Sequence, residues 1–290
     1  MQLSMFKEDL KKVVNVSKIP QISPFRFPGG KTWLVPIIRR WLLNIKEKPS
    51  VFIEPFAGGG IVSLTVASEN LSEKVIMVEL DDEIAAVWKT ILGNNYKWLS
   101  ERIISFNLTF ETAKEILNQE PKSLRDKAFQ TILKNRIFHG GILAKGSGML
   151  KKGENGKGIH SRWYPETLRK RINKIALLKN KISFIEGDGL AIMEKYNNLN
   201  NCVFFLDPPY TAGGKRAGSR LYRFSKIDHE KIFHLASKAR YDCLFTYDNA
   251  PEVKNLAEKY GFDTRLIAMQ NTHLSKMLEL LIGKDLSWLD

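Results

Sequence analysis

The sequence predicts an α/β fold with a doubly wound, mainly parallel sheet that is covered by helices on both faces. Several short apolar runs lack polar alternation, as strands do when both of their faces are buried. Helical patterns separate these runs, and repeated strand–helix–strand order is typical of doubly wound sheets. A chain of 290 residues is long enough for one large domain or for a domain with a sizeable insertion.

The expected strands fall in six segments of the chain. They are residues 51–56, 74–80, 181–187, 202–207, 243–248 and 276–283. Helices are expected between them, among others at residues 82–92, 228–239 and 251–260. Because ligands of such sheets bind beyond the carboxyl ends of the strands, the residues that follow each apolar run are the first candidates for a site.

Residues 101–177 interrupt this alternation with helical patterns and a glycine-rich loop, and they contain no convincing core strand. Within 121–175 there are 14 Lys and Arg residues against 3 Asp and Glu residues, a local charge of +11. We therefore expect a catalytic domain formed by 1–100 and 178–290, with 101–177 inserted as a mainly helical, basic lobe. The concentrated charge predicts a face that binds a polyanion.

The whole chain is basic, with 45 Lys and Arg residues against 31 Asp and Glu residues and a formal charge of +14. Such an excess favours nucleic acid, or less well an acidic membrane, as a partner. No apolar run is long enough to span a bilayer, and the first residues lack the core of a signal peptide. Cys202 and Cys243 each begin an apolar run without metal-ligand spacing, so we expect buried reduced thiols, no metal site and a cytoplasmic protein.

The segment FIEPFAGGGIVSL, residues 52–64, runs from a strand through a glycine turn into a helix. Its three consecutive glycines allow a tight turn and a close approach of a ligand to the helix N-terminus. Glu79 follows 21 residues after Gly58, and a carboxylate there can accept hydrogen bonds from both hydroxyls of a ribose. Ser63 stands where the dinucleotide fingerprint has its third glycine, so NAD and S-adenosyl-L-methionine (AdoMet) both stay open.

The segment LDPPY, residues 206–210, ends an apolar strand on an acid that two prolines and a tyrosine follow. The strand brings Asp207 to the same sheet edge as the glycine turn, and each proline stiffens the backbone while offering no N–H donor. The Asp207 carboxylate and the Pro208 carbonyl thus form a rigid pair of acceptors beside the ring of Tyr210. Such a site suits a planar aromatic amine, whose two hydrogens are accepted while its ring stacks on the tyrosine.

With FRFPGGK at 25–31 and FIEPFAGGG at 52–60 ahead of LDPPY, the chain resembles the Dam-type (D12 class) DNA adenine methylases, which carry these elements in the same order. The resemblance covers about residues 24–283. It implies a Rossmann-like, AdoMet-dependent methyltransferase sheet with an inserted target-recognition lobe. Phe27 stands where the family commonly has tryptophan, and Glu79 where it often has aspartate, and both differences keep the chemistry.

The resemblance also implies roles for individual positions. Lys31 suits the carboxylate of AdoMet, and Phe56 and Gly58 contact its methionyl part. Glu79 accepts hydrogen bonds from the ribose hydroxyls, and Asp188 accepts one from the adenine amine of the cofactor. The complete cofactor-binding set is Phe27, Gly30, Lys31, Glu54, Phe56, Gly58, Glu79, Asp188 and Asp207. The catalytic set that holds the target base is Asp207, Pro208, Pro209 and Tyr210.

On the DNA side, the target base would have to leave the duplex to reach such a crevice. Residues 135–171 combine glycines with many positive charges, and 211–226 carry five positive charges and no acid directly after the catalytic set. We expect 211–226 to be a loop that orders on DNA and closes over the base. The candidate DNA contacts are Arg136, His139, Lys151, Lys152, Lys157, Arg162, Lys215, Arg216, Arg220 and Tyr222.

The sequence therefore predicts a site-specific DNA methyltransferase that transfers a methyl group from AdoMet to the exocyclic amine of a flipped adenine in double-stranded DNA. We expect a monomer with no membrane partner, and a cognate restriction endonuclease is a candidate partner. The same chemistry on cytosine or on RNA stays open, as does a non-catalytic DNA-binding protein on a methylase fold. An NAD oxidoreductase is the least favoured alternative, because nothing in the sequence offers its substrate chemistry.

Overall fold

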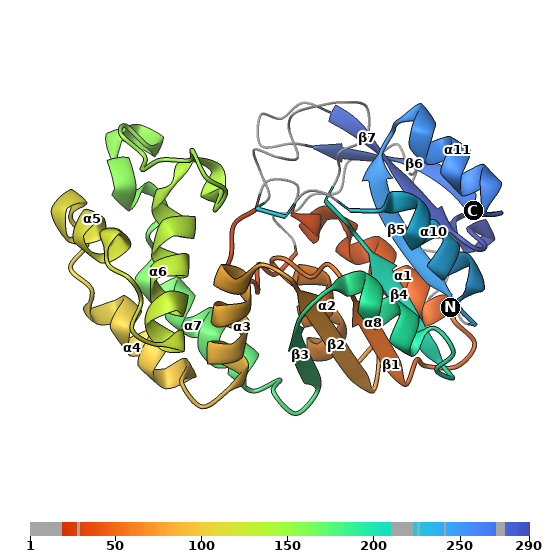
Figure 1. Ribbon diagram of the computed structural model, residues 1–290, viewed down its shortest axis with the longest axis horizontal. Coiled ribbons are helices and arrows are strands. Elements are labelled where there is room, and N and C mark those ends of the chain that lie inside the picture. Colours follow the sequence, from red (N-terminus) through yellow and green to blue (C-terminus); the bar gives the residue numbers. More distant parts are fainter. Residues whose placement is uncertain (1–18, 28–29, 210–222, 225–226, 241, 271–275) are drawn as a thin grey trace.

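The computed structural model describes residues 19–27, 30–209, 223–224, 227–240, 242–270 and 276–290 (Figure 1). Within these residues, seven strands form one sheet in the order β3-β2-β1-β4-β5-β7-β6. The strands are β1 Val51–Glu54, β2 Lys74–Glu79, β3 Ile182–Glu186, β4 Cys202–Leu206, β5 Cys243–Asp248, β6 Asp263–Gln270 and β7 Lys276–Gly283. Chain order reverses between β1 and β4, so the carboxyl ends of these two strands open the crevice where such sheets bind ligands.

Strands β1 to β5 run parallel to one another, with Ile53 of β1 opposite Ile76 of β2 on one side and Phe204 of β4 on the other. Strand β7 lies antiparallel to both β5 and β6. All six expected strands are present, each within two residues of its expected bounds at either end. Strand β6 was not predicted, because its sequence DTRLIAMQ begins with three residues that are not apolar.

Helices cover both faces of the sheet, as the fold class requires. Successive residues of β1 point to opposite faces, so Phe52 belongs to one apolar core and Ile53 to the other. The first core includes the helices α1 Val35–Asn44, α2 Ile61–Ser68 and α3 Asp82–Leu92. The second includes α8 Gly189–Tyr196, α10 His229–Lys238 and α11 Pro251–Lys259. This arrangement is the doubly wound, Rossmann-like sheet that the sequence predicts.

Between α3 and β3 the described chain is helical. It contains α4 Tyr96–Ser105, α5 Phe110–Asn118, α6 Leu124–Ile137 and α7 Pro165–Ala176, with short 3-10 helices at His139–Gly141, Glu154–Gly156 and Gly158–Arg162. Figure 1 shows these helices as a group beside α3, at the β3 edge of the sheet. Buried residues of α4, α6 and α7 are continuous with the first core, so the helical segment has no separate core of its own.

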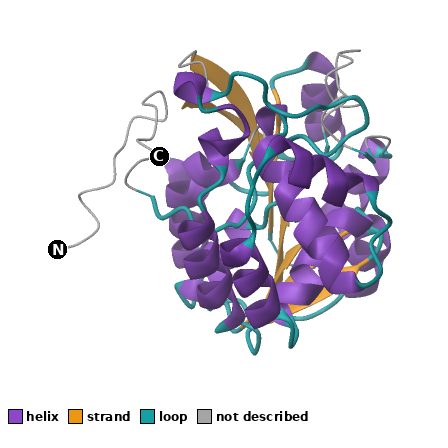
Figure 2. Cartoon of the chain, turned by 90° about the vertical axis from the view of Figure 1, so that its left-hand side faces the viewer, coloured by secondary structure: helices purple, strands orange, loops and turns teal. Residues whose placement is uncertain are grey.

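Further 3-10 helices lie at Lys31–Leu34 and Ser287–Leu289. None of the helices in the described part of the chain combines the length and the apolar composition that a membrane span requires. The thiols of Cys202 and Cys243 are free and buried, as expected, at the starts of β4 and β5. Viewed from the side of α4 to α7, the sheet lies behind a layer of helices (Figure 2).

Candidate active site

A cavity of about 1120 Å³ opens at the carboxyl ends of the central strands. Its lining comes from segments that are far apart in the sequence. They are the loop before the 3-10 helix Lys31–Leu34, the turns after β1 to β4, and the helical segment between α3 and β3. The predicted site residues that line it are Phe27, Gly30, Lys31, Glu54, Phe56, Gly58, Glu79, Arg136, His139, Arg162, Asp188, Asp207 and Pro209. The cavity is therefore the candidate active site.

The turn after β1 needs glycine at two positions, because Gly58 and Gly60 have φ values of 46° and 63°. At Gly60 a Cβ atom would also lie 2.5 Å from the Met77 Cε atom and 3.0 Å from the Trp88 ring. The Trp88 indole donates a hydrogen bond to the Gly58 carbonyl at 2.9 Å and so stabilises the turn. At Gly58 the same substituent would meet no atom within 4 Å, which leaves the cavity side of the turn open.

Glu79 ends β2 and its carboxylate supports the same turn. It accepts hydrogen bonds from the backbone N–H groups of Gly58 at 2.8 Å and Asp81 at 2.9 Å. Burial disfavours its charged form and raises the pKa of Glu79 to about 7. Burial likewise raises the pKa of Glu54 to about 8, although the Ser63 N–H donates to its carboxylate at 3.0 Å.

Asp188 lies beyond β3 and caps α8 by accepting a hydrogen bond from the Leu190 N–H at 3.0 Å. The next residue, Gly189, packs so closely that a Cβ atom there would lie 2.5 Å from the Pro55 carbonyl oxygen and 2.7 Å from the Phe56 ring. The turns after β1 and β3 are thus in direct contact. This contact holds the Asp188 carboxylate and the Phe56 ring at one wall of the cavity.

Asp207 follows β4 and is contacted by groups from two other elements, the 3-10 helix Lys31–Leu34 and strand β5. Its Oδ1 atom lies 3.0 Å from the Lys31 Nζ atom and accepts a hydrogen bond from the Thr246 hydroxyl at 2.9 Å. Lys31 is buried, and its Nζ atom also lies 3.9 Å from a carboxylate oxygen of Glu279 on β7. Burial raises the pKa of Glu279 to about 7. The Asp207 side chain is 21% exposed, so it remains accessible from the cavity.

The remaining catalytic positions are described only in part. Pro208 is buried directly behind Asp207, and Pro209 lines the cavity. Tyr210 lies outside the described residues. The same holds for four candidate DNA contacts in the following segment, namely Lys215, Arg216, Arg220 and Tyr222.

Three of the described candidate DNA contacts, Lys151, Lys152 and Lys157, do not line the active-site cavity. Lys151 and Lys152 line a neighbouring cavity of about 590 Å³, which shares His139 and Arg162 with the larger one. Lys157 is exposed and lines neither cavity. Arg136 is only 4% exposed, so it does not lie on an open surface as a reader of base edges would. Its role in base contact stays a prediction.

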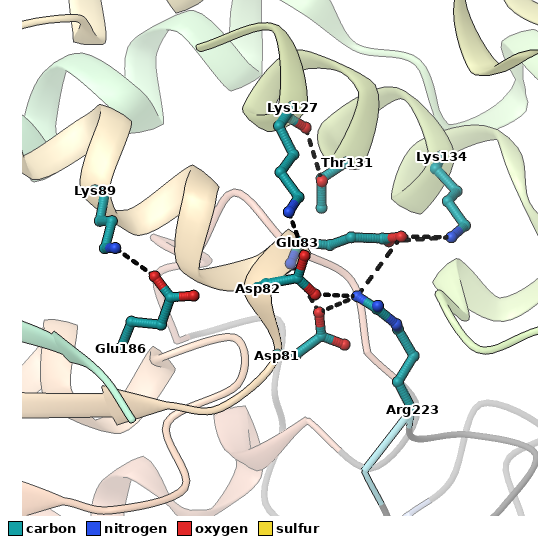
Figure 3. Close-up of polar contacts among 9 residues, drawn as sticks. All are labelled: Asp81, Asp82, Glu83, Lys89, Lys127, Thr131, Lys134, Glu186 and Arg223. Carbon is teal, nitrogen blue, oxygen red and sulfur yellow. Dashed lines mark hydrogen bonds and ion pairs between the residues drawn. The ribbon is translucent and has the colours of Figure 1, made fainter. Parts of the chain in front are cut away.

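Sequence reasoning missed Arg223, which borders the cavity just beyond the catalytic segment. Its Nη1 atom lies 2.6 Å from Asp81, 2.8 Å from Asp82 and 3.6 Å from Glu83, three acids at the N-terminus of α3 (Figure 3). The excess of positive charge in 211–226 signals a polyanion partner, whereas this arginine binds acids of its own chain. Its pairing with the acids depends on tertiary contact that the sequence does not reveal.

The same acids connect α3 to the helical segment. Lys127 of α6 pairs with Asp82, and the Lys134 Nζ atom lies 3.0 Å from a Glu83 carboxylate oxygen (Figure 3). Negative side chains in the first turn of a helix also interact favourably with its positive N-terminal end. The acidic start of α3 therefore joins three parts of the chain: the turn after β2, helix α6 and the residue that follows the catalytic segment.

The donor set of the cavity suits an adenosine-containing cofactor. Glu79 and Asp188 offer carboxylate acceptors at the ends of neighbouring strands, and the open side of the Gly58 turn permits close approach. The Phe56 ring and Leu80, which is 47% exposed, add apolar surface. The volume of the cavity leaves room for such a cofactor together with a base.

Comparisons with known proteins agree with this chemistry. The profile of the D12 class N6 adenine-specific DNA methyltransferase family matches residues 27–270. Type II methyltransferase M.CviBI of Paramecium bursaria Chlorella virus NC1A is 25% identical over 241 residues, which are 81% of this chain and 86% of the relative. Type II methyltransferase M.MjaIII of Methanocaldococcus jannaschii is 26% identical over 234 residues, which are 73% of this chain and 78% of the relative.

The solved structures that match this chain are more distant in sequence. An rRNA methylase from Streptococcus thermophilus has a TM-score of 0.38 at 10% identity, with 87% of this chain and 95% of that one covered. The rRNA methyltransferase aviRa from Streptomyces viridochromogenes has a TM-score of 0.39 at 12% identity, with 96% of each chain covered. The family match, which spans most of the chain, decides the identity. The chain belongs to the D12 class N6 adenine-specific DNA methyltransferase family and is an AdoMet-dependent enzyme that methylates adenine at specific sites in DNA.

Proposed function

We propose that Asp207 is the centre of methyl transfer to the exocyclic amine of an adenine that has been turned out of double-stranded DNA. The observation that carries this proposal is the shared cavity, in which Asp207 faces the same space as the Gly58 turn and Glu79. The Thr246 hydroxyl donates to its carboxylate at 2.9 Å and holds it in position for an incoming donor. Positioning of this kind can contribute roughly 7–11 kcal/mol in favourable cases.

Within this proposal, the residues around the turns of β1 to β3 hold AdoMet. Glu79 accepts hydrogen bonds from the ribose hydroxyls and Asp188 from the adenine amine of the cofactor, while Lys31 faces its carboxylate. When bound, AdoMet supplies an electrophilic methyl group on a sulfonium. The other residues of the cofactor-binding set are Phe27, Gly30, Glu54, Phe56, Gly58 and Asp207.

The target amine is oriented by two acceptors. The Asp207 carboxylate and the Pro208 carbonyl accept its two hydrogens, which directs the nitrogen lone pair toward the methyl group. Tyr210 stacks on the base, and such stacking contributes about 1–3 kcal/mol. The proton leaves after transfer, so no separate base with a shifted pKa is needed.

The DNA lies against residues 101–177 in this proposal, with the catalytic domain formed by 1–100 and 178–290. Base flipping costs a few kcal/mol, and contacts from Lys151, Lys152 and the other candidate DNA contacts offset it. We extend the proposal to a monomer that acts in the cytoplasm. Because both relatives are named type II methyltransferases, we also propose a cognate restriction endonuclease as a counterpart.

The test compares wild type with Asp207→Asn, a variant of nearly the same size that loses the negative charge. Modified-base sequencing of DNA from a host that expresses the wild-type chain identifies the methylated base and the site. On a duplex with that site, we expect Asp207→Asn to lower the rate of methyl transfer by roughly 100-fold or more. DNA affinity and the melting temperature report whether the variant is folded. A folded variant with a wild-type rate would refute the role of Asp207, and sequencing that finds no methylated adenine would refute the proposed function.

A further inference from the structure

Four arginines line one part of the active-site cavity. Arg26 lies in the loop before the 3-10 helix Lys31–Leu34, and Arg136 lies in the last turn of α6. Arg162 ends the 3-10 helix Gly158–Arg162, and Arg171 lies on α7. We call these four residues the arginine cluster. The carboxylates of the cavity come instead from the ends of β1 and β2, from the turns after β3 and β4, and from the starts of α3 and α10. The cluster therefore belongs to the part of the cavity that the helical segment and the N-terminal loop build.

Backbone contacts hold the cluster in place. The Arg171 Nη1 atom donates to the Ser23 carbonyl at 3.0 Å, and the Arg136 Nη2 atom donates to the Pro24 carbonyl. Asn135 fixes the Arg26 backbone on both sides, since its Oδ1 atom accepts from the Arg26 N–H at 2.9 Å and its Nδ2 atom donates to the Arg26 carbonyl at 2.8 Å. Helices α6 and α7 are thus tied to residues 23–26, and all four arginines line the same cavity.

Three members of the cluster carry a positive charge that no described carboxylate balances. Arg26, Arg136 and Arg171 form no ion pair with a described carboxylate, and the Arg26 guanidinium donates no hydrogen bond to a described residue. The Nε atom of Arg136 is buried without an acceptor. Burial lowers the pKa of Arg136, and the positive charges of Arg171, Arg26 and Arg162 lower it further. Arg136 is buried and the other three arginines are partly exposed, and an unbalanced buried charge is unfavourable unless an anion binds to it.

The cluster also lies where the two cavities meet. Arg26, His139 and Arg162 line both the active-site cavity and the neighbouring cavity of about 590 Å³, whose wall includes Lys151 and Lys152. Positive charge therefore continues from the exposed lysines to the interior. A DNA strand that delivers a flipped nucleotide has to bring its backbone past this junction.

We propose that Arg26, Arg136, Arg162 and Arg171 bind the phosphodiester groups that flank the nucleotide entering the cavity. This inference rests on the proposed function, because it takes the flipped nucleotide as given. Guanidinium groups match phosphate oxygens with paired hydrogen bonds, and four of them exceed what the single carboxylate of AdoMet can use. For that carboxylate the cavity offers Lys31, which is not part of the cluster.

The test uses Arg26→Gln, which removes one positive charge and no hydrogen bond to a described residue. The matched control is Lys174→Gln, which removes one positive charge from an exposed position of α7 outside both cavities. Affinity for a fluorescein-labelled duplex that contains the methylation site is measured against NaCl concentration. We expect Arg26→Gln to lower the slope of log affinity against log salt by about one, and to weaken binding roughly five- to tenfold at 0.1 M salt.

Two further measurements decide what the cluster binds. Arg26→Lys restores the charge, so we expect it to recover the wild-type salt slope while Lys174→Gln never loses it. The Kd for AdoMet, measured by calorimetry without DNA, should be the same for wild type and Arg26→Gln. A weaker Kd for AdoMet with an unchanged salt slope would assign the cluster to the cofactor carboxylate and overturn the inference.

The failure of this inference differs from the failure of the proposed function. If wild type methylates adenine and binds the duplex, but Arg26→Gln binds with an unchanged slope, only the inference falls. If wild type neither binds nor methylates DNA, the proposed function falls and the inference with it.

Discussion

Single residues of the site could be predicted from the sequence where a motif fixes both their type and their place at a strand end. Glu79 and Asp207 follow apolar runs, and the structure brings both to one cavity. What the sequence could not show is the partner of each group. Lys31 lies against Asp207 in this structure, and no motif predicts that contact. The missed residues Arg171 and Arg223 lie in basic stretches, where net charge alone does not tell which side chain faces the cavity, and Arg26 lies in the FRFPGGK segment, where it was given no role.

The pKa of Glu79 leads to a testable pH dependence of cofactor binding. Burial raises this pKa to about 7, so the carboxyl is mostly protonated at pH 6 and mostly ionised at pH 8. Only the carboxylate accepts from both ribose hydroxyls, so the affinity for AdoMet should rise roughly tenfold from pH 6 to pH 8. Calorimetric titration at several pH values measures this rise. Glu79→Gln should bind weakly with a flat profile, and a rise that persists in that variant would assign the titration to another carboxyl such as Glu54 or Glu279.

At the scale of elements, apolar runs predicted strands better than they predicted boundaries or direction. The turn at Gly58 and Gly60 was recognised because consecutive glycines between a strand and a helix have few structural explanations. Strand β6 was missed since Asp263, Thr264 and Arg265 dilute its apolar pattern. The antiparallel direction of β7 was also beyond reach, because the order of residues in a strand does not encode its direction in the sheet.

The glycine turn gives a prediction about stability. Gly60→Ala places a methyl group against the buried side chains of Met77 and Trp88 in a left-handed backbone conformation. The matched control is Gly261→Ala, where φ is 72° but no atom lies within 4 Å of the added Cβ. Urea unfolding should show a loss of about 1–3 kcal/mol more for Gly60→Ala than for the control. Equal losses would mean that the backbone conformation alone, and not packing beneath the turn, requires glycine.

At the scale of the molecule, the order of the central strands explains why distant motifs form one site. Strands β2, β1 and β4 are neighbours, so the turns that follow them open into the same space although more than a hundred residues separate β2 from β4. The doubly wound class could be predicted because apolar runs and helices alternate. The shared core between α3 and the helices α4, α6 and α7 could not, since the sequence suggested a lobe set apart by its charge.

The contact between Lys31 and Asp207 has a consequence for how strongly the two substrates affect each other's binding. Lys31 faces the cofactor in our proposal, yet here it holds the carboxylate that should receive the target amine. A cofactor that draws Lys31 toward its own carboxylate would leave Asp207 freer to accept the adenine, so cofactor and DNA should tighten each other's binding reciprocally. We expect S-adenosylhomocysteine to raise the affinity for a duplex with the methylation site several-fold, and Lys31→Met to abolish that gain. Equal DNA affinity with and without the cofactor product in wild type would show that the two sites are independent, whereas coupling would make the enzyme retain DNA better while its cofactor site is occupied.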